Sequence, residues 1–166
     1  MNYRTLGKTK LTVSEIGLGC WELGGETIIN GIPLTYGEVT KNTASQLIQT
    51  ALKMGINTFD TADIYSLGNS EKRLGSEIKK LKKKINFFTK GGIFPAQNTP
   101  LPVDVDLSYE YLISCIKRSL TRLQIDKIEL FQAHKPPKNE KEIRELEKTF
   151  TKIKEDELSL SCGVSI

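Results

Sequence analysis

Apolar residues follow two alternating periods along this chain. Short apolar runs, typical of buried strands, occupy residues 15–19, 56–60, 85–90, 128–134 and 158–165. Between these runs, apolar positions recur every three to four residues, as on one face of a helix, within residues 43–54, 70–81, 108–123 and 139–154. A helix between successive strands predicts an α/β fold with parallel strands, whose carboxyl ends gather at one end of the sheet.

The segments outside this alternation predict one hairpin and two loops. Residues 3–14 contain two short alternating segments around Gly7 and Lys8, a pattern typical of a β-hairpin. Residues 23–40 are rich in glycine and polar side chains, and residues 91–105 contain three prolines. We expect both segments to be loops. The second is longer than most connections, which favours a functional role for it.

Several residues are expected to mark the ends of the helices. Gly55 follows the first predicted helix at a position where a glycine C-cap is common. Asn69 or Ser70 is expected to cap the second helix, and Ser108 the third. The second helix ends in a lysine-rich run, residues 79–84. We interpret this run as a solvated helix end, where lysines offset the negative end of the helix dipole, in preference to a nucleic-acid patch.

Chain length bears on the type of α/β fold. An open, doubly wound sheet of five strands is complete at 166 residues, whereas a (β/α)8 barrel typically needs about 250 residues. No low-complexity segment or composition shift divides the chain, so we expect one domain over residues 1–166.

Composition excludes several classes of protein. The net charge of +4 is modest, which argues against a nucleic-acid partner, and no apolar run has the length of a signal peptide or membrane span. We therefore expect a cytoplasmic protein without a membrane partner. Cys20, Cys115 and Cys162 are widely spaced and His134 is the only histidine, so neither a disulfide framework nor a metal site is indicated.

Four ionisable residues lie at or just beyond the ends of predicted strands: Asp60, Tyr65, Lys90 and His134. A tyrosine has an ordinary pKa of about 10, so it needs assistance to exchange protons near neutrality. A nearby lysine ammonium favours the phenolate, and a carboxylate holds that lysine in place. A histidine could orient a bound carbonyl. Taken alone, each of these four residues is equally well or better explained as a structural residue at a strand end, and Trp21 as a packing residue. The joint placement of the four ionisable residues at one end of the sheet favours a functional site.

These residues fall within motifs that resemble the aldo-keto reductase family. The motifs are GLGCW at residues 17–21, GINTFDTADIY at 55–65, GNSE at 68–71 with Leu74-Gly75, Thr89-Lys90, SLTRL at 119–123 with Asp126, LFQAH at 130–134 and GVS at 163–165. They span nearly the whole chain in the family's order and spacing.

The resemblance implies a fold and a reaction. The family fold is a (β/α)8 barrel with an N-terminal hairpin at its bottom, and its reaction is the reversible NAD(P)H-dependent reduction of aldehydes and ketones. By resemblance, Tyr65 donates the proton to the carbonyl oxygen of a small substrate, Lys90 lowers the pKa of Tyr65, Asp60 pairs with Lys90, and His134 orients the substrate.

The resemblance also implies a cofactor site. Gly19, Cys20 and Trp21 match the family's cofactor-facing loop, Asp60 lies beside it, and Ser165 matches a serine that contacts the nicotinamide amide. Family members usually carry asparagine after that serine, where this chain has Ile166. NADPH is the expected cofactor, and NADH is left open.

The chain matches the family only through about the fifth strand, and thus five of eight strand-helix units. We therefore expect a partial (β/α)8 barrel, a single incomplete domain without the units that hold the cofactor's pyrophosphate and adenosine phosphate. Its first and last strands would be open edges. We expect little or no activity from the isolated chain. The alternative is a non-catalytic remnant or assembly module, similar to the family's channel-associated subunits, that binds a partner through these edges. Self-association and a complementing C-terminal fragment, which the enzyme would require, are the expected protein partners.

Overall fold

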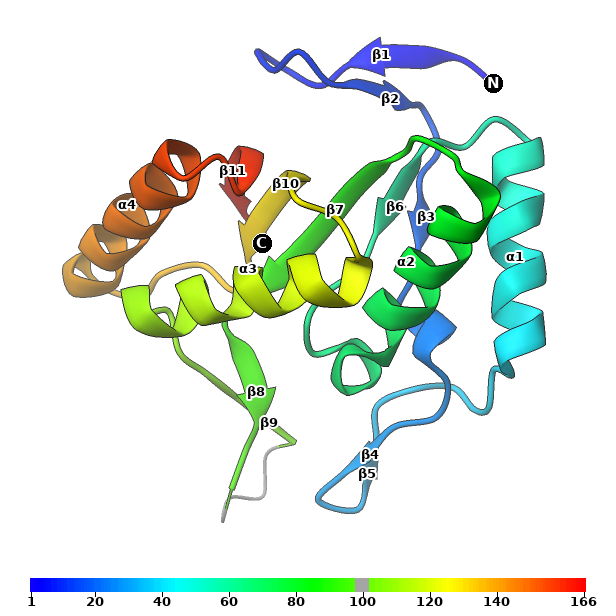
Figure 1. The fold of residues 1–166 in the computed structure, drawn as a ribbon. Helices are drawn as coiled ribbons and strands as arrows, with labels where there is room; N and C mark the ends of the chain where they lie inside the picture. The colour runs from blue at the N-terminus through cyan, green and yellow to red at the C-terminus, as the bar shows by residue number, and fades with distance from the viewer. Residues whose placement is uncertain (98–101) are drawn as a thin grey trace.

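The computed structural model describes residues 1–97 and 102–166 and contains a parallel sheet with four helices along one side (Figure 1). From one edge to the other, the strands are β3 (Leu18–Gly19), β6 (Thr58–Asp60), β7 (Asn86–Gly91), β10 (Ile128–Ala133) and β11 (Ser159–Val164). The helices are α1 (Lys41–Lys53), α2 (Asn69–Leu81), α3 (Tyr109–Leu123) and α4 (Glu140–Glu155).

The strand order separates the two α/β architectures. Each strand pairs in parallel with the strand that precedes it along the chain, without a reversal of order. Right-handed crossovers then place all the helices on the same face, and α1, α2, α3 and α4 pack against one another in sequence. A doubly wound sheet reverses its order and carries helices on both faces. The open doubly wound alternative is therefore wrong, and the sheet is part of a (β/α)8 barrel wall.

The hydrophobic core fills the layer between sheet and helices. Phe59 and Phe131 are fully buried strand residues, and Ile48, Leu74 and Ile116 meet them from three helices. Burying each such side chain stabilises the fold by about 1.5–3 kcal/mol. The apolar positions of the helical and the strand patterns therefore point into the same core, between the sheet and the helices.

The helix caps are only partly as expected. Ser108 accepts a hydrogen bond from the amide of Tyr111 and caps α3, which confirms that prediction. The N-cap of α2 is Gly68, so the prediction of Asn69 or Ser70 is wrong. The side chains of Asn69 and Ser70 instead donate hydrogen bonds to backbone carbonyls of the segment after β3.

Both predicted loops contain additional secondary structure. The segment 23–40 overlaps a short 3-10 helix, η1 (Glu22–Gly24), and contains the hairpin of β4 (Ile28–Ile29) and β5 (Ile32–Pro33). Asn30 and Gly31 both have positive φ there, as in the tight turns that Asn-Gly favours. The segment 91–105 contains the hairpin of β8 (Ile93–Pro95) and β9 (Val103–Val105), and its residues 98–101 lie outside the described part of the chain.

The hairpins lie at opposite ends of the sheet (Figure 1). The N-terminal hairpin, β1 (Tyr3–Thr5) with β2 (Thr12–Ser14), confirms the expected one. The side chains of Asn57 and Asn86 donate to its Thr12 carbonyl at 3.0 and 2.9 Å, which ties it to the amino ends of β6 and β7. The other two hairpins extend from the carboxyl ends. None of the helices in the described ranges has the length and apolarity needed to span a membrane.

Candidate active site

The structure brings the four ionisable candidates together at the carboxyl end of the sheet. Asp60 is the last residue of β6, Lys90 lies near the end of β7, and His134 directly follows β10. Tyr65 begins the short 3-10 helix η2 (Tyr65–Gly68), after β6. Because β6, β7 and β10 are neighbours in parallel register, the carboxyl ends of these strands lie side by side at the same end of the sheet.

Lys90 is the buried centre of this group. Only 6% of the residue is exposed, and its ammonium donates hydrogen bonds to the Asp60 carboxylate and, at 2.9 Å, to the Thr61 carbonyl. The same ammonium lies 5.2 Å from the centre of the Tyr65 ring. A buried cation needs such partners, and Asp60 supplies a compensating charge while Tyr65 adds a cation–π contact.

Tyr65 lies between two other rings. Its ring is stacked on Trp21, with centroids 6.0 Å apart and an angle of 23° between the planes. On another side it meets His134 edge to face, at 5.6 Å and 76°. Trp21 also contacts Tyr36 at 6.1 Å. The aromatic contacts restrict where the Tyr65 ring can lie, so its hydroxyl has a defined place at the end of the sheet.

His134 is a neutral imidazole at physiological pH. Burial, together with the nearby ammonium groups of Lys90 and Lys135, lowers the pKa of His134 to about 4. Its Nδ1 atom is buried and has no hydrogen-bond partner among the described residues. A neutral ring has one N–H donor and one acceptor nitrogen, so it can orient a polar ligand without adding a charge.

The turn after Tyr65 has a strained backbone. Ser66 and Leu67 have φ values of 47° and 53°, and Gly68 has a φ of 85°. Left-handed backbone costs roughly 1–2 kcal/mol for a residue other than glycine. Ser66 Oγ donates to the Gly25 carbonyl at 2.8 Å, which holds the turn against the segment after β3. Strain of this kind is often found at functional sites.

A cavity of about 320 Å³ opens beside these residues. It is lined by Trp21, Thr27, Leu34, Ile64, Tyr65, Ser66, Ile93, Val103, His134 and Lys135. Most of this surface is aliphatic or aromatic, and Tyr65 and His134 contribute convergent polar groups. Small-molecule sites commonly combine an apolar wall with a few polar groups in this way.

The residues that resemble a cofactor-facing loop are divided between surface and core. Trp21 is 44% exposed, and the position of a Cβ on Gly19 has no atom within 4 Å, so open space adjoins the end of β3. Cys20 is fully buried among core residues, and burial raises the pKa of its thiol. Ser165 follows β11 and its amide donates to the Ala133 carbonyl at 2.9 Å. The open space at Gly19 leaves room for a ligand beside the end of β3.

Comparison with known proteins shows the family. The family model described as "Aldo/keto reductase family" matches residues 15–165. The chain belongs to the aldo-keto reductase family. The family is one of oxidoreductases. The partial (β/α)8 barrel with its N-terminal hairpin, expected from the motifs, is confirmed by the sheet and by solved structures of the family.

Individual relatives match between 81% and 99% of this chain. A Schizosaccharomyces pombe protein named as a voltage-gated potassium channel subunit beta is 34% identical over 98% of the chain and 44% of its own length. The 6-dehydroglucose reductase of Novosphingobium aromaticivorans is 38% identical over 81% of the chain and 41% of its own length. The holo form of a Bacillus halodurans aldo-keto reductase superposes with a TM-score of 0.83 at 32% identity, and the match covers 99% of this chain and 50% of that protein. The chain thus spans about half the length of these relatives.

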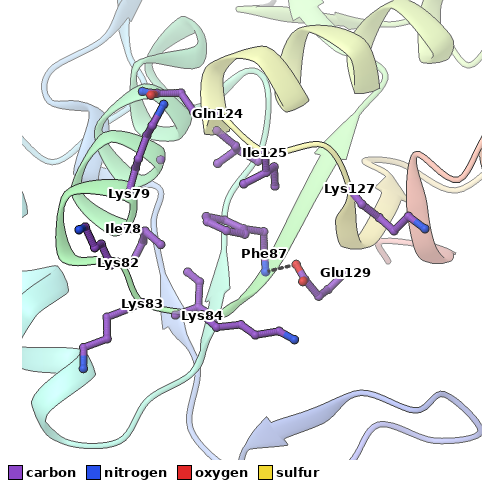
Figure 2. A pocket seen from close by; sticks show the side chains of 13 residues that line it. Ile78, Lys79, Lys82, Lys83, Lys84, Phe87, Gln124, Ile125, Lys127 and Glu129 are labelled. Atoms are coloured by element: carbon purple, nitrogen blue, oxygen red, sulfur yellow. Dashed lines mark hydrogen bonds between the residues drawn. The ribbon is translucent and has the colours of Figure 1, made fainter.

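A second cavity, of about 310 Å³, lies where α2 and α3 end, near the amino ends of β7 and β10 (Figure 2). Five lysines line it: Lys79, Lys82, Lys83, Lys84 and Lys127. Lys127 pairs with Glu157 at 3.2 Å. The other four surround the carbonyl end of α2, where cations offset the helix dipole. This geometry supports a solvated helix end, and binding to DNA at low salt would contradict that interpretation.

Beneath the site lies a buried polar cluster that the sequence interpretation missed. Burial raises the pKa of Asp63 to about 6, and the nearby Glu71 carboxylate adds to this rise. A hydrogen bond with the Cys115 thiol and the charges of Arg122 and Arg118 lower the pKa and offset part of the rise. Asp63 Oδ1 is buried without a partner among the described residues.

In the described ranges, no group of three or more His, Cys, Asp or Glu side chains could hold a metal ion.

Asp63→Asn is expected to change how stability depends on pH. Because the folded-state pKa of about 6 lies above the ordinary value of 3.8, the contribution of Asp63 to stability is fully present below pH 3.8 and is lost as the pH rises through 6. Relative to wild type, the variant should therefore gain on the order of 2–3 kcal/mol in unfolding free energy between pH 4 and pH 7. Urea denaturation across this range measures the gain. The exposed Asp126→Asn should show no such trend, and a flat difference for Asp63→Asn would contradict the prediction.

Proposed function

We propose that this site reduces aldehydes and ketones with NAD(P)H and that Tyr65 donates the proton. The observation that carries the proposal is the position of the Tyr65 ring, which lies between the Lys90 ammonium, at 5.2 Å, and the ring of neutral His134, at 5.6 Å, beside an apolar cavity. The family and its reductase relative support the same chemistry.

Each side chain has a distinct task in this proposal. A carbonyl oxygen gains negative charge as the bond is reduced, so it takes the proton of the Tyr65 hydroxyl. The Lys90 ammonium stabilises the phenolate that remains, and Asp60 and the Thr61 carbonyl hold that ammonium in place. The His134 ring donates or accepts a hydrogen bond without a change of charge, which fixes the orientation of the substrate. The apolar walls exclude water from the reacting group.

The cofactor assignment is part of the proposal. When bound, a reduced nicotinamide supplies hydride to the carbonyl carbon. Gly19 and Trp21 would hold its ring beside Asp60, and Ser165 would contact its amide, as the family resemblance implies. The Bacillus halodurans relative is described as a holo form, which supports a nicotinamide cofactor for this chain as well. We propose NADPH, with NADH as the alternative.

A second function is favoured by the sheet edges. In the part of the chain that the structure describes, β3 and β11 each pair with a neighbour on one side only. Unpaired edges can accept strands from another polypeptide. Since one relative is named as a channel beta subunit, a partner-binding module that does not turn over substrate is the alternative. The partner would be a second copy of the chain, whereas a complementing C-terminal fragment belongs to the reductase proposal.

A fluorescence titration of the chain with NADPH distinguishes these proposals. Trp21 is the only tryptophan, and its place in the site makes its emission a specific reporter of the cofactor. We expect saturable quenching by a species of defined mass, with NADPH oxidation on adding an aldehyde. Absence of quenching by a folded chain would contradict the reductase proposal and favour the partner-binding one.

A further inference from the structure

A buried ion pair connects the turn that carries Tyr65 with the strand that carries Lys90. Glu71, in the first turn of α2, is fully buried. One of its carboxylate oxygens accepts a hydrogen bond from Arg122 Nε at 2.6 Å, and the other accepts from Thr89 Oγ1 at 2.7 Å. Because a buried carboxylate is unstable without partners, these donors fix the relative positions of α2, α3 and β7.

On the α3 side, the Arg122 side chain lies directly against the strained turn. A Cβ placed on Gly68 would be 2.7 Å from Arg122 Cδ and 2.8 Å from its Nε, so only a glycine leaves room for this contact. Gly68 follows Ser66 and Leu67, which both have left-handed backbone, and all three come directly after Tyr65. A turn of this kind persists only where its surroundings hold it. Arg122 is one such support.

On the β7 side, the Thr89 hydroxyl anchors the residue that precedes Lys90. Thr89 is fully buried, and its side chain leaves the strand toward the helices, whereas the next residue along a strand projects to the opposite face. Lys90 therefore extends from the sheet toward Asp60 and Tyr65. Thr89 is hydrogen-bonded to Glu71 on the opposite face of the strand.

We propose that Glu71, Arg122 and Thr89 are positioning residues for the site, because together they fix the separation between the Lys90 ammonium and the Tyr65 ring. None of the three touches the cavity beside Tyr65. The catalytic consequence rests on the proposed reductase function, but the positioning itself is a property of the folded chain.

Thr89→Val tests the proposal with the smallest change, because it keeps the shape of the side chain and removes its hydroxyl donor. In chain labelled with 13C in its tyrosine rings, the Tyr65 signals, assigned by their loss in Tyr65→Phe, report its distance from Trp21 and His134. We expect these signals to shift in Thr89→Val and to return in Thr89→Ser. Under turnover, kcat should fall roughly 10- to 100-fold with little change in NADPH affinity.

Thr149→Val is the matched control. Thr149 is also a fully buried threonine, and its hydroxyl donates to the Glu145 carbonyl at 2.7 Å within α4. This variant should leave the Tyr65 signals and kcat unchanged. The proposal is overturned if Thr89→Val leaves the Tyr65 signals in place, or if Thr149→Val moves them equally. If the wild-type chain showed no turnover, that result would contradict the reductase function only. The Tyr65 ring signals would still test whether Thr89 positions the Tyr65 ring.

Discussion

Replacing Tyr65 with phenylalanine is expected to lower carbonyl reduction by a factor of about 10² to 10⁴, which is the usual contribution of a positioned proton donor. The phenyl ring keeps the stack on Trp21 and the edge contact with His134, so the site should retain its shape. Only the hydroxyl group is removed, and with it the proton that is donated. The measurement is kcat for NADPH oxidation with an aldehyde, by the chain alone or with a complementing polypeptide, alongside the NADPH dissociation constant from Trp21 quenching.

Tyr109→Phe is the matched control for this prediction. Tyr109 also has a lysine over its ring, with Lys148 Nζ 4.0 Å from the centroid, but its amide donates to the Glu145 carboxylate on α4 and it does not line the cavity beside Tyr65. Its loss should leave kcat and NADPH affinity unchanged. If Tyr65→Phe retained wild-type kcat, or if it weakened NADPH binding as strongly as turnover, Tyr65 would not be the proton donor that we propose.

The alternation of apolar periods predicted the parallel strands and four helices because each period reflects burial on one face of its element. It could not distinguish an open sheet from part of a barrel. That choice depends on which strands are neighbours, and the same alternation along the chain is compatible with either order. Motif resemblance supplied the correct architecture. The hairpin at Asn30 and Gly31 was missed although its Asn-Gly turn was present, because its strands are only two residues each.

The ionisable candidates of the site could be predicted because parallel strands bring their carboxyl ends together, whatever the separation along the chain. The buried pair beneath them was missed because Glu71 and Arg122 are 51 residues apart and lie on two different helices. One signal was available. Glu71 lies three and seven residues before Leu74 and Ile78, so a carboxylate occupies the apolar face of α2 and requires a buried partner.

Removing one member of that pair should strongly destabilise the fold. In Arg122→Met, the Thr89 hydroxyl is the one donor to the Glu71 carboxylate that remains among residues 1–97 and 102–166, while the carboxylate stays fully buried. Leaving a buried charge without its counter-ion typically costs about 3–5 kcal/mol, so we expect a loss of that size in the unfolding free energy. Urea denaturation at pH 7 measures it. Arg118→Met, one turn earlier on α3, removes an exposed arginine with hydrogen bonds to Ser114 and Cys115 and should cost about 1 kcal/mol or less.

The double variant Glu71→Met/Arg122→Met separates the cost of an unpaired charge from the value of the pair. With both charges replaced by apolar side chains of similar length, no buried ion remains at this position, and such replacements are often neutral. We expect the double variant to be more stable than Arg122→Met by about 2 kcal/mol or more. A double variant as unstable as the single one would mean that Arg122 acts through its packing against Gly68 alone. If stability returns while the Tyr65 ring signals stay displaced, the ion pair serves chiefly to position the site, which is a role that apolar packing cannot supply.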